Sequence, residues 1–407
     1  MTTTVLVIFL VVYLGMLLGR FPRLQLDRTG IALLGAIALL AAGALRFEEA
    51  QAAIDTSTLA LLFGLMVISA QLRLGGFYTR ITRTTAELGL SPSALLAVLV
   101  LAVGALSAVF SNDIVCLAAT PVLIDACRHR RLDPVPFLLG LAAAANVGSA
   151  ATLIGNPQNM LIGQTLEVSF SGYLTEAGPP ALAALLATWA VIALQYRGRW
   201  ALAAAEGSDC EEPQPFDRWQ TTKGLAVAFV LLLAFLFTPW PREIIALACA
   251  GYLLTSRKLH SRSMLGLVDW QLLVLFIGLF VVNHALEKVG LVAQAVSVLD
   301  ARGVHLGHPA WLFSLTAVLS NAVSNVPAVM LILPLADHPQ AASILGLSST
   351  LAGNFLIPGS IANIIVVDLA LQRGIVIDWR RHGRTGIPVT VVTLALAALY
   401  LWVRGSP

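Results

Sequence analysis

Amides and hydroxyls interrupt the long apolar runs of this chain in a pattern that could bind a small solute. The stretch LIGNPQNMLIG places Asn156 and Asn159 on either side of Pro157 and Gln158, within an apolar segment. A Pro inside a helix costs about 3 kcal/mol, and each unsatisfied polar group in lipid costs several kcal/mol more. Hydrogen bonds to a passing solute would explain polar residues at this depth. The pattern therefore indicates a binding site for a small molecule or an ion within a membrane.

The polar motifs are also typical of helix N-termini. Asn156 precedes a Pro and Ser360 follows a Pro-Gly pair, which combines a capping residue with a break in the helix. A Ser-Asn pair that is separated from a Pro by eight residues occurs twice, starting at Ser111 and at Ser324. Helices that restart at these places would present free N–H groups, and roughly half a positive charge each, to one cavity. The predicted substrate- or ion-binding residues are Ser111, Asn112, Asp113, Asn146, Gly148, Ser149, Thr152, Gly155, Asn156, Asn159, Ser324, Asn325, Asn354, Gly359, Ser360 and Asn363.

Asp113 differs from the other candidates because it is a carboxylate. It directly follows the first Ser-Asn pair, whereas Val326 holds the corresponding place after the second. A carboxylate at membrane depth is costly and is by default a functional residue. We expect Asp113 to be the proton- or cation-coupling residue, the alternative being a cap on the helix that it begins. Asp55 and Asp269, each at the start of an apolar segment, are expected to be helix N-caps.

Composition indicates where these residues work. Of the 407 residues, 58% are hydrophobic and 12% are charged, with a mean hydropathy of +0.84. Soluble proteins carry about twice that fraction of charge, and apolar runs of roughly 17 to 20 residues can cross a bilayer as helices. We therefore expect an all-α, polytopic protein of the inner (plasma) membrane. The small net charge of +3 gives no indication of a nucleic-acid partner.

Enzymatic and metal-dependent functions find no support in the motifs. No His or Cys stands beside them, and no nucleophile–base pair is evident. The four cysteines show no CxxC spacing, so neither a metal site nor a disulfide framework is predicted. We expect no cofactor other than a coupling ion, H⁺ or Na⁺.

The chain repeats itself weakly. Asp55 and Gly64 correspond to Asp269 and Gly278, each 214 residues later, and the two Ser-Asn motifs are 213 residues apart. GNPQN, from Gly155, corresponds to GSIAN with an offset of 204. Three signals in one order predict a duplicated unit. The predicted parts are a first transmembrane repeat (1–200), a cytoplasmic linker (201–220) and a second transmembrane repeat (221–407).

Each half divides into six apolar segments. The fourth carries Ser-Asn in its middle, and its second copy is too short for two crossings, which need about 40 residues. We expect a re-entrant hairpin with Ser-Asn at the tip. The fifth is interrupted by Gly, Asn, Pro or Ser, so one crossing by a broken helix is expected. The predicted segments are 3–19, 29–45, 56–72, 91–127, 135–166 and 178–195, then 222–239, 241–256, 270–287, 309–336, 343–371 and 386–403.

The distribution of positive charge predicts the orientation. Most of the 25 Lys and Arg fall in loops that are cytoplasmic if the N-terminus is outside, as the positive-inside rule requires. Each half then crosses five times, so the second half is inverted, with about ten crossings plus two hairpins. Both termini are expected on the outer, periplasmic side. Inverted repeats with broken helices are typical of secondary transporters.

Four stretches resemble the ion transporter superfamily, and most closely its arsenite permease and NhaD-like anion permease branch. They are FSNDIVCLAATP, AANVGSAATLIGNPQNMLIG, SNAVSNVPAVMLILP and STLAGNFLIPGSIANIIVVDLA. The superfamily also includes silicic acid effluxers and Na⁺-coupled dicarboxylate carriers. The resemblance implies a homodimer of elevator type and solute contacts from Ser111, Asn112, Ser324 and Asn325. The dicarboxylate carriers have Ser-Asn-Thr at both tips, whereas this chain has Asp113 and Val326 at the third positions.

Three transport functions remain open at this point. The first is H⁺-coupled efflux of a small oxyanion or metalloid hydroxide such as arsenite. It is favoured because no Lys or Arg lies in the interior of a predicted span, so a highly charged anion would be balanced only by helix dipoles. The second is Na⁺-coupled symport of a dicarboxylate or inorganic anion. The third is Na⁺/H⁺ antiport.

Overall fold

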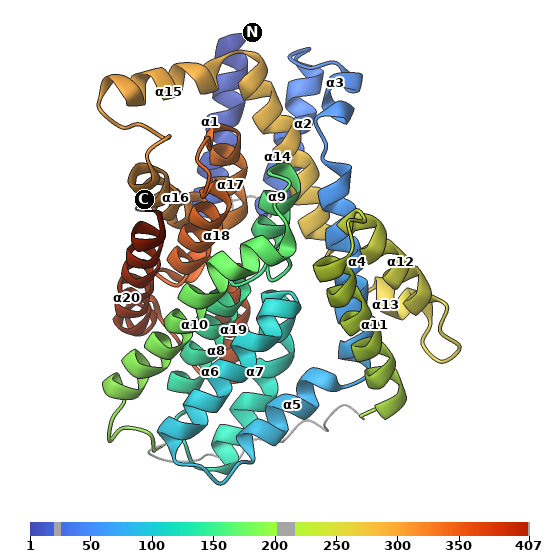
Figure 1. The fold of residues 1–407 in the computed structure, drawn as a ribbon, viewed down its shortest axis with the longest axis vertical. Helices are drawn as coiled ribbons and strands as arrows, with labels where there is room; N and C mark the ends of the chain where they lie inside the picture. Colours follow the sequence, from blue (N-terminus) through green and yellow to red (C-terminus); the bar gives the residue numbers. More distant parts are fainter. Residues whose placement is uncertain (20–25, 202–215, 406–407) are drawn as a thin grey trace.

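Helices make up nearly all the regular structure of the protein (Figure 1). The computed structural model describes residues 1–19, 26–201 and 216–405. No strand is found within these ranges, although isolated bridges occur, one of them between Leu132 and Ala201. Arg20, Arg23, Cys210 and most of the predicted linker lie outside the described residues.

The helices of the two halves follow one order. In the first half they are α1 (Thr2–Leu18), α2 (Arg28–Ala41), α3 (Phe47–Ala52), α4 (Thr56–Leu74), α5 (Phe77–Ala86), α6 (Pro92–Val109), α7 (Asn112–His129), α8 (Pro134–Ser149), α9 (Pro157–Thr165) and α10 (Phe170–Gln195). In the second they are α11 (Arg218–Phe237), α12 (Arg242–Leu254), α13 (Ser261–Leu265), α14 (Trp270–Lys288), α15 (Leu291–Ala301), α16 (Pro309–Val323), α17 (Asn325–Ile332), α18 (Ala341–Ala352), α19 (Ile361–Gln372) and α20 (Trp379–Gly405). Two 3-10 turns, η1 (Leu333–Leu335) and η2 (Ile357–Gly359), complete the second half. Thus α1 corresponds to α11, and so on to α10 and α20.

The predicted all-α, polytopic fold is confirmed. Within the described ranges, six helices are long and apolar enough to cross a membrane, namely α4, α6, α10, α11, α14 and α20. The predicted segment 91–127 is divided into α6 and α7 at Ser111, and 135–166 is divided into α8 and α9. The segments 309–336 and 343–371 are divided in the same way. The inverted orientation of the two halves stays a prediction.

Two boundaries differ most from the sequence-based expectation. Helix α10 begins at Phe170 rather than at 178, because the helix continues through Pro179 and Pro180. Helix α20 begins at Trp379 rather than at 386. Helices α3, α5, α13 and α15 fall outside the predicted segments, since each is too short to cross a bilayer.

Carboxylate caps fix several helix starts. Asp55 Oδ1 accepts a hydrogen bond from the Thr58 amide at the start of α4, and Asp269 Oδ1 accepts one from the Leu272 amide at the start of α14, both at 3.0 Å. The predicted capping role of these two residues is confirmed. Each bond satisfies one of the N–H groups that a helix start leaves without a backbone partner.

The halves interlock through their helices. Helix α2 packs against α14, α4 packs against α12, and α10 packs against α20. The hairpin helices cross over too, since α7 contacts α19 and α17 contacts α9. In Figure 1, α3 and α15 lie at the end of the molecule that also holds the N-terminus, and α5 lies at the opposite end. We call these the α15 end and the α5 end.

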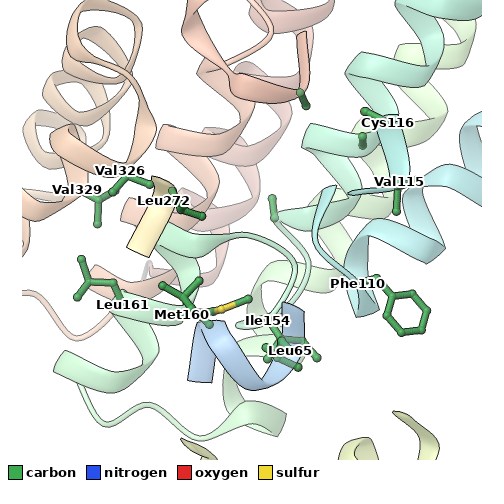
Figure 2. Close-up of a cluster of buried hydrophobic side chains, with 14 of the residues drawn as sticks. Leu65, Phe110, Val115, Cys116, Ile154, Met160, Leu161, Leu272, Val326 and Val329 are labelled. Carbon is green, nitrogen blue, oxygen red and sulfur yellow. The ribbon is translucent and has the colours of Figure 1, made fainter. Parts of the chain in front are cut away.

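Buried hydrophobic side chains join the α4–α14 pair to the broken helix α9 and the hairpin helix α17. Figure 2 shows Leu65 and Leu272 from α4 and α14 in one cluster with Met160, Val326 and Val329. All five are at least nine-tenths buried. Burial of each such side chain contributes about 1.5–3 kcal/mol.

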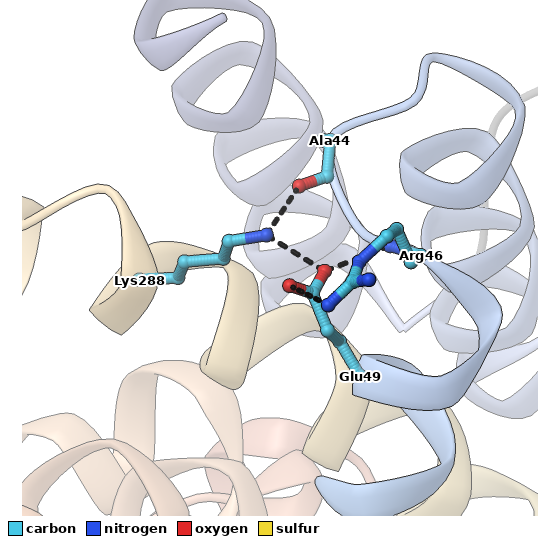
Figure 3. Close-up of polar contacts among 4 residues, drawn as sticks. All are labelled: Ala44, Arg46, Glu49 and Lys288. Carbon is cyan, nitrogen blue, oxygen red and sulfur yellow. Dashed lines mark hydrogen bonds and ion pairs between the residues drawn. The ribbon is translucent and has the colours of Figure 1, made fainter.

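An ion-pair cluster ties α3 to the end of α14 (Figure 3). Lys288 Nζ donates to Glu49 Oε2 at 2.7 Å and approaches the Ala44 carbonyl at 3.5 Å. The Arg46 amide also donates to Glu49 Oε2, at 2.8 Å. These donors lower the pKa of Glu49 to about 2, the hydrogen bond from Lys288 being the largest cause.

Candidate functional site

Helix α8 ends at Ser149 and α9 begins at Pro157, so the predicted broken helix is present. The Asn156 side chain caps α9 by accepting a hydrogen bond from the Asn159 amide at 2.9 Å. Asn159 Nδ2 then reaches back to the carbonyls of Ser149, at 3.2 Å, and Thr152, at 2.9 Å. The Asn159 side chain therefore closes the break by satisfying carbonyls that the end of α8 leaves free.

The second broken helix, between α18 and α19, is closed in the same manner. Ser360 Oγ accepts from the Ala362 amide at the start of α19. Asn363 Nδ2 donates to the carbonyls of Gly353, at 2.8 Å, and Leu356, at 3.1 Å. Asn363 lies 204 residues after Asn159, and so do both of its acceptors relative to those of Asn159. The repeat found in the sequence is therefore also a repeat of hydrogen bonds.

Asn146 connects the two breaks. Its Oδ1 accepts from Asn112 Nδ2, at 3.2 Å, and from Ser360 Oγ, at 2.8 Å. Its Nδ2 donates to Asn354 Oδ1, at 2.8 Å, and to Asn363 Oδ1, at 3.1 Å. All four capacities of this buried amide are used, and its partners come from the hairpin tip and from the other half. We call these five residues the Asn146 network.

The network continues through Ser149 and Asn156, which were predicted, to Gln158 and Thr350, which were not. Ser149 Oγ donates to the Asn146 carbonyl and accepts from Asn156 Nδ2. Thr350 Oγ1 accepts from Asn156 Nδ2, at 3.3 Å, and from Gln158 Nε2, at 3.1 Å. Thr350 lies 204 residues after Asn146, so the offset of the repeat could have identified it from the sequence.

Each hairpin tip packs against the break of its own half. The Asn112 amide donates to the Gly155 carbonyl at 3.3 Å. Asn325 Nδ2, oriented toward the acceptors around it, donates to the carbonyls of Gly359, at 3.0 Å, and Ser349, at 3.1 Å. Ser349 was not among the predicted residues. The two tips therefore hold corresponding places, as their sequence motifs predict.

Three predicted glycines permit close backbone approach. A Cβ on Gly148 would lie 2.2 Å from the Gly104 carbonyl oxygen, and a Cβ on Gly155 would lie 2.3 Å from that of Ser149. A Cβ on Gly359 would lie 3.0 Å from the Gly353 carbonyl oxygen, a milder conflict. The first two positions therefore tolerate no side chain without movement of the backbone.

Four predicted residues lie beside the Asn146 network without joining it. The hydroxyl of Thr152 donates to the Ala108 carbonyl at 2.5 Å, which fixes the loop after α8 to the end of α6. Among the described residues, no side-chain hydrogen bond is found for Ser111, Asp113 or Ser324, although Ser324 holds an unusual φ of 77° at the second tip. Asp113 lies in the first turn of α7.

Sequence reasoning also missed two arginines that reach the broken helices. Arg28 and Arg242 begin α2 and α12, 214 residues apart, and each contacts the other half of the chain. Arg28 Nη2 donates to the Pro358 carbonyl in the second break at 3.3 Å. Arg242 Nη2 donates to the Gly163 carbonyl near the far end of α9 at 2.8 Å. The five residues of the Asn146 network include no cation, but Arg28 brings a guanidinium to the edge of this network. Arg242 lies inside the predicted segment 241–256, so the prediction that no cation lies within a span is wrong there.

Comparison with known proteins adds to this geometry. Residues 4–351 match the family described as citrate transporter. The chain belongs to that family. It is 27% identical to the silicon efflux transporter LSI3 of Oryza sativa subsp. japonica, with 92% of each chain covered. It is 31% identical to the inner membrane protein YbiR of Escherichia coli, over 81% of this chain and 84% of that one.

A solved structure has the same overall fold. The YdaH transporter of Alcanivorax borkumensis, described as having an unusual topology, aligns with a TM-score of 0.59 at 16% identity. The alignment covers 100% of this chain and 99% of that one. Together with the family match, this supports the resemblance to the ion transporter superfamily and shows that this family member is a multi-pass membrane transporter.

Proposed function

We propose that the protein is a secondary active transporter of a small neutral hydroxide, such as arsenious or silicic acid, and that it couples efflux to H⁺. The observation that carries this proposal is the composition of the Asn146 network, which consists of amides and one hydroxyl. Asn112 Oδ1 and Asn354 Nδ2 are buried and have no partner among the described residues. One can accept and the other can donate, which matches a solute whose hydroxyl groups do both.

The charge of the network favours a neutral solute over a strongly charged one. An isolated charge buried among amides lacks a counter-ion, and its burial is costly. A hydroxide solute exchanges its water hydrogen bonds for those of Asn112 and Asn354 with no such cost. The relative named as a silicon efflux transporter is consistent with this class of solute.

Coupling to protons would pass through Asp113. Its carboxyl lies one residue after Asn112, at the hairpin tip, and makes no hydrogen bond or ion pair among the described residues. A carboxyl so placed can bind a proton on one side of the membrane and release it on the other. Movement of the hairpins and broken helices as an elevator, past the interlocked α2–α14 and α4–α12 pairs, would carry both solute and proton.

A second candidate function is Na⁺-coupled symport of a dicarboxylate or inorganic anion. Arg28 favours it, because its half-buried guanidinium contacts the break at Pro358 and its Nε has no partner among the described residues. The citrate transporter family name is consistent with an anion. An anion at the second break would take up that free donor.

Solute flux into proteoliposomes under imposed gradients distinguishes the two functions. The panel is arsenite, silicic acid, succinate and citrate, each with a pH gradient alone and with a Na⁺ gradient alone. Movement of arsenite or silicic acid that follows the pH gradient without Na⁺ supports the proposal. Uptake of succinate or citrate that requires Na⁺, with no movement of arsenite or silicic acid, would contradict the proposal and support Na⁺-coupled symport instead.

A further inference from the structure

A cavity of about 180 Å³ lies at the α15 end, between α14, the broken-helix segment α9 and the hairpin helix α17. One water needs only about 10–15 Å³ on this measure, and drug-sized ligands occupy about 300–1,000 Å³. The volume therefore suits one small solute with a few waters. It lies apart from the Asn146 network, since it shares no lining residue with it.

The cavity is polar at its mouth and apolar at its floor. Thr165 and Glu287 are exposed, whereas Leu161, Met330 and Leu333 are buried. Asn283 and His284, both half-buried, lie between the two zones. The walls thus offer an amide, a hydroxyl, an imidazole and a carboxylate, all of which can hydrogen-bond a hydroxyl group.

A chain of contacts connects the cavity to the second hairpin tip. Tyr13 Oη donates to Asn283 Oδ1 at 2.8 Å and lies 3.4 Å from the carbonyl of Pro327. Pro327 is in the first turn of α17, two residues after Asn325. The opposite end of the amide, Asn283 Nδ2, is buried and has no partner among the described residues. The side-chain amide of Asn283 therefore has a free N–H donor at a position between the cavity and the second hairpin tip.

The charges at the cavity exclude one class of solute. Its lining contains no Lys or Arg within the described part of the chain, and Glu287 is its one carboxylate. The neighbouring Lys288 is engaged by Glu49. An anion in the cavity would therefore face a carboxylate with no facing cation, whereas a neutral hydroxide can donate to that carboxylate.

We infer that this cavity is a second solute-binding site, which takes a neutral polyhydroxy solute as it enters or leaves at the α15 end. The inference rests on the proposed function and adds to it a place outside the Asn146 network where the same solute binds. Asn283, His284 and Glu287 are the residues that bind it, and Thr165 lies at the mouth through which it enters. Tyr13 holds Asn283 in position next to the α17 tip.

Protection of a cysteine at the mouth tests binding directly. Thr165→Cys is placed in a chain whose four native cysteines are replaced by alanine, and the purified protein in nanodiscs is labelled with a maleimide. Silicic acid at ten times its dissociation constant is expected to slow labelling about tenfold. Succinate is expected to leave the rate unchanged. Thr175→Cys is the matched control, because Thr175 is also exposed but does not line the cavity.

Filling the cavity tests its use in transport. Ala53 lines the cavity and Ala52, next to it in α3, does not. Ala53→Trp is expected to slow silicic acid flux severalfold relative to Ala52→Trp. Should Ala53→Trp fail to fold, the labelling experiment stands alone.

The outcomes separate this inference from the proposed function. Flux of silicic acid through the unmodified protein without protection of Thr165→Cys by silicic acid would overturn the inference alone. Protection by succinate equal to that by the hydroxides would also overturn it. An unmodified protein that moves neither hydroxide would overturn the proposed function, and the inference with it.

Discussion

Helices α5 and α15 hold corresponding places in the two halves, yet only α5 packs against its hairpin. Three aromatic rings make that contact, with Tyr78 at 5.4 Å from Phe77 and 5.9 Å from Phe110, centroid to centroid. Tyr78 is 2% exposed. The cavity left beside this cluster measures about 10 Å³.

Aliphatic residues hold the same places around α15. Leu291, Val292 and Val323 correspond to Phe77, Tyr78 and Phe110 by the offsets of the repeat. Helix α15 has no buried residue, and α14 is the main element that it contacts. Val292 also lines the cavity of about 180 Å³ that lies between α14, α9 and α17. The comparison shows that side-chain volume at a few positions, rather than the order of helices, decides which hairpin is tightly enclosed.

The two arginines show a second difference between the halves. Arg28 meets the second broken helix at its break, at Pro358, whereas Arg242 meets the first near its far end, at Gly163. If the two halves had the same arrangement, both arginines would contact their broken helix at the break, or both would contact it near the far end. In the elevator movement proposed above, this difference would correspond to a displacement of the hairpins and broken helices along the interlocked helices toward one end.

The largest expected effect comes from removing the ring of Tyr78. Tyr78→Val gives α5 the residue that α15 has, and the cavity it leaves should cost about 3 kcal/mol. A clear fall in the midpoint of thermal unfolding in detergent is expected. Val292→Ala in α15 is the control and should cost less than about 1 kcal/mol, because Val292 is half-exposed. Equal losses from both variants would break the comparison.

The Arg28 contact should have a smaller effect. Arg28→Gln removes a donor to Pro358 that is worth about 1 kcal/mol, a change of about fivefold in the population of the displaced arrangement. The rate of maleimide labelling of Thr165→Cys, which reports on the α15 end, should change accordingly. Arg242→Gln should change that rate in the opposite direction. If both variants change it in the same direction, the arginines do not report displacement.

Much of this arrangement was predictable from the sequence. The breaks at Asn156 and Ser360 follow from capping residues beside Pro or Gly, and the hairpin tips follow from the Ser-Asn pairs, because both signals are local. The enclosure of α5 was not predictable, since Tyr78 acts on Phe110 across a distance in sequence. The same holds for Arg28, whose contact with Pro358 spans 330 residues. The 204-residue offset could have identified Thr350, because a residue predicted in one half of a repeat indicates the corresponding residue in the other half.

Placing in α15 an aromatic ring that corresponds to Tyr78 should have a more modest effect on labelling and stability. Val292→Tyr places in α15 the residue that closes the α5 end. The ring should enter the cavity and slow labelling of Thr165→Cys, with a slight rise in the unfolding midpoint. Val298→Tyr is the control, because Val298 is exposed on the same helix and does not line the cavity. An unchanged labelling rate in Val292→Tyr would show that α15 stays apart for another reason.

The smallest expected effect concerns the ion pair between Glu49 and Lys288 at the α15 end. The pKa of Glu49 is lowered to about 2 in the fold, against about 4.3 when unfolded. Its stabilising contribution is therefore present above about pH 4.3 and is lost as the pH falls toward 2. Thermal unfolding of Glu49→Gln and the parent should converge over that interval. A difference that persists below it would assign the effect to packing.

The most direct test of the central claim measures protons moved per solute in the unmodified protein and in Asp113→Asn, the tip residue whose counterpart is Val326. Proteoliposomes carrying a pH-sensitive dye and an imposed silicic acid or arsenite gradient report both fluxes together. We expect solute flux to drive a proton flux in the unmodified protein. In Asp113→Asn, we expect no proton flux, while solute still moves down its gradient. An unchanged proton-to-solute ratio in Asp113→Asn would contradict this expectation.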